Sequence, residues 1–259
     1  MSIIEAIVLG LVQGLTEFIP VSSSGHLIIA HELFGTTDST LVFDVALHIG
    51  TLLALMIFFW KDILGLMKNV FAKNTQGKLS RIIIVGTIPA GLIGYLFSDW
   101  IDDNLRKPIT VVITMIIMGL LMLAVEKYSS KKRTVSSVTM QDGVKIGFAQ
   151  ALALIPGVSR SGATITTGMI QGLKRADSAR LSFLMAIPIT AGAIAGSLLG
   201  AEQGELSGQT NIFAIGILMA LVSGLFAIRF LLRFLSNNSL SVFAYYRIAL
   251  AVIVFLTLV

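Results

Sequence analysis

Long apolar runs alternate with short polar segments along most of the chain. A helix that crosses a bilayer needs about 17 to 25 predominantly apolar residues. Six runs approach that length, at residues 41–60, 82–98, 109–125, 181–199, 211–232 and 242–258. The pattern predicts an all-α polytopic membrane protein with six full transmembrane helices.

Two further apolar segments, at about residues 3–35 and 144–173, are each interrupted by a polar phrase. Proline, serine and glycine at the centre of each phrase disfavour a continuous helix and leave two short arms. At an offset of 137 residues the phrases share the aligned pairs Gln13 and Gln150, Leu15 and Leu152, Val21 and Val158, Ser22 and Ser159, Ser24 and Ser161, and Gly25 and Gly162. Polar groups are costly at membrane depth. The duplicated phrase therefore predicts a functional site.

The placement of basic residues favours re-entrant hairpins over single crossings for these two segments. Four basic groups occur: Lys61, Lys68, Lys73, Lys78 and Arg81; Lys127, Lys131, Lys132 and Arg133; Lys174, Arg175 and Arg180; and Arg229 with Arg233. If 144–173 enters and returns, all four groups lie on one face, as expected of cytoplasmic loops. By the repeat, 3–35 is expected to be re-entrant as well, although its first arm is long enough to leave a deeper insertion open.

The whole chain, 1–259, is expected to form one membrane domain with two internal repeats, 1–126 and 143–259. A basic cytoplasmic linker, 127–142, joins them. Each half would hold one re-entrant helical hairpin and three transmembrane helices. Because three is an odd number, the second half is inverted relative to the first. The hairpins then enter from opposite faces, and their tips meet near the midplane, where inverted-repeat membrane proteins commonly build a site.

Composition supports this class of protein. Apolar residues make up 55% of the 259 residues and charged residues 13%, with a mean hydropathy of +0.89. The formal net charge of +5 is better explained by cytoplasmic loops than by nucleic-acid binding. The chain has no cysteine, which excludes disulfides, thiol catalysis and thiolate metal sites.

Together the two phrases hold the groups that phosphoryl transfer requires. The first offers a carboxylate at Glu17, hydroxyls at 22–24 and an imidazole at His26; the second offers the guanidinium of Arg160, whose fork can pair two phosphate oxygens. Ser-Gly turns that lead into a helix also expose backbone N–H groups to an anion. Candidate substrate-binding residues are Gln13, Ser22, Ser24, Gly25, Gly157, Ser159, Ser161 and Thr164.

Purely structural roles also fit these residues. Serine and glycine in membrane helices often serve close packing, and Glu17 with Arg160 would also make a structural ion pair between the hairpins. His31 is interpreted as an interfacial residue and His48 as a packing residue.

The ordered motifs resemble those of a known family. Gln13-x-x-x-Glu17, Pro20-Val-Ser-Ser-Ser-Gly-His26, Pro156-Gly-Val-Ser-Arg-Ser-Gly-Ala-Thr164 and the closing Phe243-Ala-Tyr-Tyr-Arg247 stretch are similar to those of the undecaprenyl-diphosphate phosphatases, the bacitracin-resistance family of bacterial inner membranes. The similarity covers essentially the whole chain.

The resemblance implies hydrolysis of undecaprenyl diphosphate to undecaprenyl phosphate and inorganic phosphate, which recycles the lipid carrier for peptidoglycan synthesis. It further implies a pocket that opens to the outer, periplasmic face, and a divalent cation. Glu17 is expected to hold that cation, Mg or Ca, through its oxygens, to orient the His26 imidazole, or to do both. The catalytic set carried over to this sequence is Glu17, Ser23, His26 and Arg160. Many members of the family have glutamate where this chain has Gln13.

Several alternatives stay open at the level of sequence. His26 lies three residues after Ser23 and is expected to serve as the base of a serine nucleophile; His26 as nucleophile, or attack by water, fits equally. The expected partner is a polyprenyl diphosphate lipid; a homodimer is compatible with a sequence that is silent on oligomeric state. A polyprenyl-phosphate flippase or transporter is the alternative function, because discontinuous helices around a midplane site are typical of transporters.

Overall fold

The computed structural model describes residues 1–35, 40–200 and 210–259. Within these residues the chain forms helices and no β-strand, which confirms the all-α prediction. The elements are α1 Ile3–Phe18, α2 Ser23–Phe34, α3 Thr40–Phe58, α4 Trp60–Asn69, α5 Thr75–Leu105, α6 Pro108–Tyr128, the 3-10 turn η1 Val135–Ser137, α7 Met140–Leu152, α8 Arg160–Ile170, α9 Arg175–Gly200, α10 Thr210–Asn237 and α11 Ser241–Leu258.

Several of these helices are long and apolar enough to cross a membrane, so the chain is a multi-pass membrane protein. By length and composition, 4 helices in the described part qualify: α5, α6, α9 and α10. The pair α3 and α4, bent by 76°, adds a fifth if the pair counts as one span, and α11 is a shorter apolar helix. The six-span arrangement stays a prediction.

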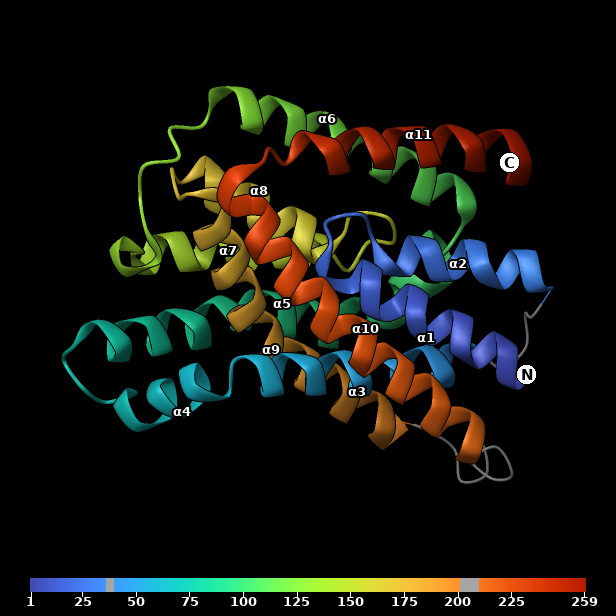
Figure 1. Ribbon diagram of the computed structural model, residues 1–259, viewed down its shortest axis with the longest axis horizontal. Helices are drawn as coiled ribbons and strands as arrows, with labels where there is room; N and C mark the ends of the chain where they lie inside the picture. Colours follow the sequence, from blue (N-terminus) through green and yellow to red (C-terminus); the bar gives the residue numbers. More distant parts are fainter. Residues whose placement is uncertain (36–39, 201–209) are drawn as a thin grey trace.

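The two interrupted segments fold as broken helices, as their proline, serine and glycine content predicts. α1 and α2 flank the first turn, and α7 and α8 flank the second. Figure 1 shows that α1 and α2 extend from the middle of the molecule toward the end that holds both termini, whereas the α6–α7 linker lies at the opposite end. The two turns meet in the middle, where Ser161 Oγ donates to the Ile19 carbonyl at 3.3 Å.

Side-chain caps set where two helices begin. Thr139 caps α7, its hydroxyl accepting from the Asp142 N–H while the Asp142 carboxylate accepts from the Thr139 N–H. This capping box starts α7 at Met140, so the last residues of the predicted linker 127–142 are already helical. Asn74 caps α5 in a similar way, accepting from the Gly77 N–H at 2.8 Å, which extends this helix well before the apolar run at 82–98.

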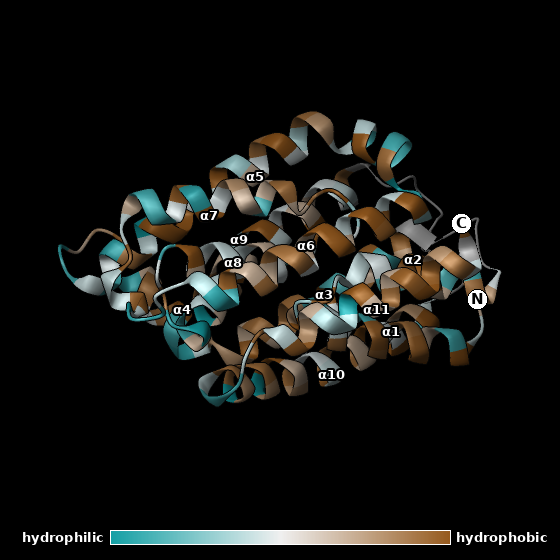
Figure 2. Cartoon of the chain, turned by 90° about the horizontal axis from the view of Figure 1, so that it is seen from above, coloured by the Kyte–Doolittle hydropathy of each residue, from teal (hydrophilic) through white to brown (hydrophobic). Residues whose placement is uncertain are grey.

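The basic segments are tied together at one end of the molecule. Glu126, at the end of α6, pairs with Lys131 of the linker and Arg175 at the start of α9, and accepts from the Leu240 N–H before α11. Arg180 of α9 pairs with Asp62 of α4 at 2.5 Å. Hydrophilic colours gather around α4 and the neighbouring helix ends, while the middle of the bundle is mostly hydrophobic (Figure 2). One end of the bundle therefore carries the basic loops.

Helices of the first half pack closely against helices of the second. α1 crosses α10 at Gly14, where an added Cβ would lie 2.0 Å from Ser223 Oγ and 2.4 Å from the Ala220 carbonyl oxygen. α5 crosses α7 at Gly86 and Gly147, where a Cβ on Gly147 would lie 2.3 Å from the Gly86 carbonyl oxygen. These crossings fix α1 and α7, the arms that carry the two turns.

We expect Gly14→Ala to separate α1 from α10 and to lower the free energy of unfolding by about 1–3 kcal/mol or more, since a backbone carbonyl cannot move aside. The matched control is Gly192→Ala in α9, where an added Cβ meets nothing within 4 Å and alanine favours the helix by about 1 kcal/mol. Thermal unfolding in detergent should show a lower Tm for Gly14→Ala only. Equal melting of Gly14→Ala and the unsubstituted protein would contradict this packing.

Candidate active site

Both polar phrases form the same capped turn. Ser22 and Ser159 adopt left-handed backbone with φ of 75° and 73°. Their hydroxyls accept from the N–H groups of Gly25 and Gly162, at 3.3 and 3.0 Å. In each turn the capping hydroxyl also lies 3.2–3.3 Å from the hydroxyl two residues later. The shared serines and glycines of the two phrases thus build two helix starts, those of α2 and α8.

Arg247 of α11 holds the two turns to each other. Its side chain is fully buried. One guanidinium nitrogen donates to the Pro20 carbonyl of the first turn at 3.2 Å, and the other donates to the Gly157 and Val158 carbonyls of the second at 2.7 and 3.0 Å. In the sequence Arg247 stood out only as part of the closing family motif, which did not indicate this role. A lone arginine inside the apolar stretch 242–258 was the available signal.

Glu17, at the end of α1, connects the phrases chemically. Its Oε1 accepts from Arg160 at 2.7 Å. Its Oε2 accepts from the Ser23 hydroxyl at 2.5 Å and from the Gln13 amide at 3.1 Å. The structure thus brings together four predicted site residues, from α1, α2 and α8, around one buried carboxylate.

Arg160 keeps hydrogen-bonding capacity beyond this pair. Of its five N–H donors, one binds Glu17, and NH1 makes a weak 3.5 Å contact with the Ser182 carbonyl. Thr164, one turn later, donates to the Arg160 carbonyl at 2.7 Å and lies 2.6 Å from Ser182 Oγ. Arg160 can therefore bind an anion without releasing Glu17.

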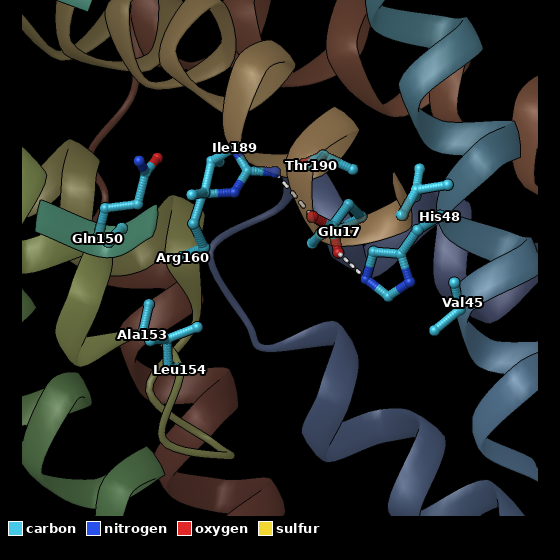
Figure 3. A pocket seen from close by; sticks show the side chains of 12 residues that line it. Glu17, Val45, His48, Gln150, Ala153, Leu154, Arg160, Ile189 and Thr190 are labelled. Carbon is cyan, nitrogen blue, oxygen red and sulfur yellow. Dashed lines mark hydrogen bonds and ion pairs between the residues drawn. The ribbon is translucent and has the colours of Figure 1, made fainter. Parts of the chain in front are cut away.

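A cavity of about 230 Å³ adjoins the pair. Figure 3 shows Glu17 and Arg160 at its centre. The lining residues are Glu17, Val45, His48, Ala90, Gln150, Ala153, Leu154, Arg160, Ile189, Thr190, Ala193 and Ile194. A few polar groups among many apolar ones are typical of a small-molecule site, and the apolar side suits a lipid chain.

The interpretation of His48 as a packing residue is wrong. Its Nε2 lies 3.7 Å from Glu17 Oε2 on the cavity wall, and its side chain is 34% exposed. The Asp44 carbonyl, 2.8 Å from Nδ1, can only accept, so Nδ1 donates to it and Nε2 is the ring nitrogen that faces Glu17. Periodicity placed His48 within an apolar helix but did not indicate that this face of α3 lines a cavity.

In the described part of the chain the His26 ring is hydrogen-bonded elsewhere than to Ser23, contrary to the expectation that it serves as the base of that serine. Its Nδ1 lies 2.7 Å from the Ser22 carbonyl and its Nε2 lies 2.8 Å from the Tyr246 hydroxyl. The His26 and Tyr246 rings are also stacked, with centroids 5.7 Å apart. Both ring nitrogens therefore have partners, and Glu17 is the base within reach of Ser23. Tyr246 is a second site residue whose role the sequence did not predict.

The other residues predicted to bind the substrate lie around the two turns and are not among those that line this cavity. Gly157, with φ of 87°, closes the second turn against Thr114 and Val111, where a side chain would collide. Ser24 is exposed, whereas Ser161 and Thr164 are buried. Substrate binding by Ser22, Ser24, Gly25, Gly157, Ser159, Ser161 and Thr164 stays a prediction.

Protein ligands for a metal ion are few. In the described part of the chain no three histidine, aspartate or glutamate side chains are close enough to hold one. Glu17 supplies a carboxylate, and Gln13 Oε1 is buried with no hydrogen-bond partner among the described residues. One carboxylate and one amide oxygen fit a Mg²⁺ that completes its shell with water and phosphate oxygens.

Glu17 and Arg160 line a partly apolar cavity, and the Ser23 hydroxyl binds Glu17. Helices of membrane-spanning length, α5 and α9, form part of the same wall. This arrangement defines a membrane-embedded protein suited to a phosphorylated apolar molecule. The family described as "Bacitracin resistance protein BacA" matches residues 6–253. The chain therefore belongs to this family.

Individual relatives agree with the family match. A Thermodesulfovibrio yellowstonii protein named "Undecaprenyl-diphosphatase" is 46% identical over 254 residues, covering 97% of this chain and 96% of that protein. Proteins of the same name from Rubrobacter xylanophilus and Caldicellulosiruptor bescii are 45% and 44% identical, each over 98% of this chain and 97% of its own length.

We expect Arg247→Met to loosen both turns, because three buried carbonyls lose their donor. The predicted cost is about 2–4 kcal/mol in the free energy of unfolding. Hydrogen exchange should accelerate at residues 19–25 and 153–162, with Arg233→Met, on an exposed position of α10, as control. Unchanged protection of both turns would show that Arg247 does not hold them.

Proposed function

We propose that this chain hydrolyses undecaprenyl diphosphate to undecaprenyl phosphate and inorganic phosphate. The relatives are named for that activity, and this chain matches them over nearly their whole length. The observation that carries the proposal is the Glu17 carboxylate, which lines the cavity together with Arg160 and binds both the Arg160 guanidinium and the Ser23 hydroxyl. The product is the lipid carrier for peptidoglycan synthesis, and its recycling accounts for resistance to bacitracin in this family.

Ser23 is the nucleophile that the geometry favours. Its oxygen attacks the terminal phosphorus, the bond to the bridging oxygen breaks, and the lipid phosphate leaves with that electron pair. The serine proton passes to Glu17, 2.5 Å away. Water then cleaves the bond between serine and phosphorus, adds its hydroxyl to the phosphate and returns a proton to Ser23, and the proton on Glu17 is released.

Arg160 stabilises the charge that develops on the transferred phosphoryl group. Its position fits this role because it is held by Glu17 from one side and retains free donors. The start of α8 adds backbone N–H groups with a favourable dipole. His26 as nucleophile is the competing proposal, and its two hydrogen bonds leave it less available than Ser23.

A divalent cation, Mg or Ca, is part of the proposal. When bound, such an ion neutralises charge on phosphate oxygens. Glu17 and the Gln13 carbonyl oxygen are the residues that would hold it.

We also propose the finer arrangement in the membrane: six spans, two inverted repeats, basic loops on the cytoplasmic side of the bacterial inner membrane and a cavity open to the periplasm. Matching capped turns in the two halves support the repeat. The grouping of the basic segments by Glu126 and Asp62 supports their common side. A homodimer stays a prediction. The transporter alternative is not favoured, because the relatives are named for hydrolysis.

We expect purified protein in detergent with Mg²⁺ to release phosphate from undecaprenyl diphosphate. Arg160→Ala and Glu17→Ala should each lower kcat at least about 100-fold, because each removes a group needed in the transition state. Arg233→Ala, remote and exposed, should leave kcat unchanged. The absence of phosphate release by the unsubstituted protein refutes the proposed reaction; full activity of Arg160→Ala refutes the proposed site.

Ser23→Ala should abolish formation of a phosphorylated enzyme from substrate labelled in its terminal phosphate, because the attacking oxygen is gone. His26→Ala should still form the label, on Ser23. Rapid acid quench and peptide mapping locate it, with the exposed Ser236→Ala as control. A label that survives Ser23→Ala and disappears in His26→Ala would assign the nucleophile to His26.

A further inference from the structure

Gln150 is a buried amide in the wall of the cavity, and it has no hydrogen-bond partner in the part of the chain that the structure describes. It lies in the last turn of α7 and is 2% exposed. Neither its nitrogen nor its oxygen has a hydrogen-bond partner among the described residues. It lines the same cavity as Glu17 and Arg160. Buried amides are nearly always paired, and an unpaired one costs about 1–3 kcal/mol.

The internal repeat explains why this amide is free. Gln150 corresponds to Gln13 in the first phrase, and Gln13 donates to Glu17, four residues later, at 3.1 Å. The residue four positions after Gln150 is Leu154, which has no acceptor on its side chain. The second half has therefore kept the amide but not the carboxylate that would bind it.

The surroundings of Gln150 indicate which part of a substrate it faces. In Figure 3, Gln150 and Leu154 lie on the Arg160 side of the ion pair, while His48 lies on the Glu17 side. Ser23 donates to Glu17 Oε2, the oxygen that also lies 3.7 Å from His48, whereas Arg160 donates to Oε1. Leu154 and its neighbours in the lining, Ala153, Ile189, Ala193 and Ile194, make this part of the wall mostly apolar.

We propose that Gln150 binds the phosphate group that is joined to the lipid chain. This rests on the proposed function: with the terminal phosphate beside Ser23 and Arg160, the second phosphate lies one bridging oxygen away, toward Gln150 and the apolar wall. The amide nitrogen donates to a non-bridging oxygen of this phosphate. Gln150 is thus a binding residue that distinguishes a lipid-linked phosphate from free phosphate.

The experiment compares Gln150→Leu with the unsubstituted protein in detergent. Calorimetry measures binding of farnesyl phosphate, farnesol and inorganic phosphate. We expect Gln150→Leu to weaken farnesyl phosphate binding about tenfold or more, with less than a twofold change for farnesol and inorganic phosphate. The ligand-free Tm should be unchanged or higher, because an unpaired buried amide is removed. Gln141→Leu, exposed on the same helix, is the matched control.

Two outcomes would overturn the proposal: unchanged affinity for farnesyl phosphate, or an equal loss for farnesyl phosphate and inorganic phosphate. Gln150→Glu serves as a second variant in case Gln150→Leu fails to fold. Its side chain has the shape of glutamine, and its negative charge repels an anion. It should therefore lose more affinity for farnesyl phosphate than Gln150→Leu. Binding is measured separately from phosphate release, so a protein that binds farnesyl phosphate through Gln150 but hydrolyses nothing refutes only the proposed function.

Discussion

The need to satisfy backbone carbonyls away from water governs how the two interrupted segments fit together. Each turn leaves helical geometry in the interior of an apolar protein, where an unpaired carbonyl is expensive. Arg247 donates hydrogen bonds to carbonyls of both turns, to Pro20 in the first and to Gly157 and Val158 in the second. One side chain therefore sets the spacing of the turns, and with it the separation of Glu17 from Arg160.

The ion pair between Glu17 and Arg160 depends on that spacing, and it is poorly explained as a stabilising device. Burying both charges costs desolvation energy that a single pair seldom repays. The pair is instead arranged for chemistry: the carboxylate accepts a serine proton on one oxygen, and the guanidinium keeps donors for an anion. Close helix crossings at Gly14 and Gly147 supply the rigidity that holds these groups in place.

The features that could be predicted from the sequence are those with local or repeated signals. Apolar runs predicted the helices, and the serine and glycine of both phrases predicted the turns with their caps. The meeting of Glu17, Ser23 and Arg160 followed from the repeat. His48 and Gln150 escaped prediction because periodicity shows that a helix is apolar without showing which face borders a cavity. The contacts of His26 with Tyr246 and of Arg247 with Pro20 escaped because the partners lie more than 200 residues apart in the chain.

The two phrases of the site share the serines and glycines that form their turns but differ in the side chains that face the cavity. A second half that kept the glutamate of the first phrase would place a carboxylate at position 154 as well, in the wall of the cavity that Glu17 and Arg160 line. A second negative charge there would repel a diphosphate and compete for the same guanidinium. Leu154 removes that charge, turns the wall apolar and frees the Gln150 amide. The same substitution therefore lets the cavity accept both an anionic group and a lipid chain, which neither phrase could do as an unmodified copy of the other.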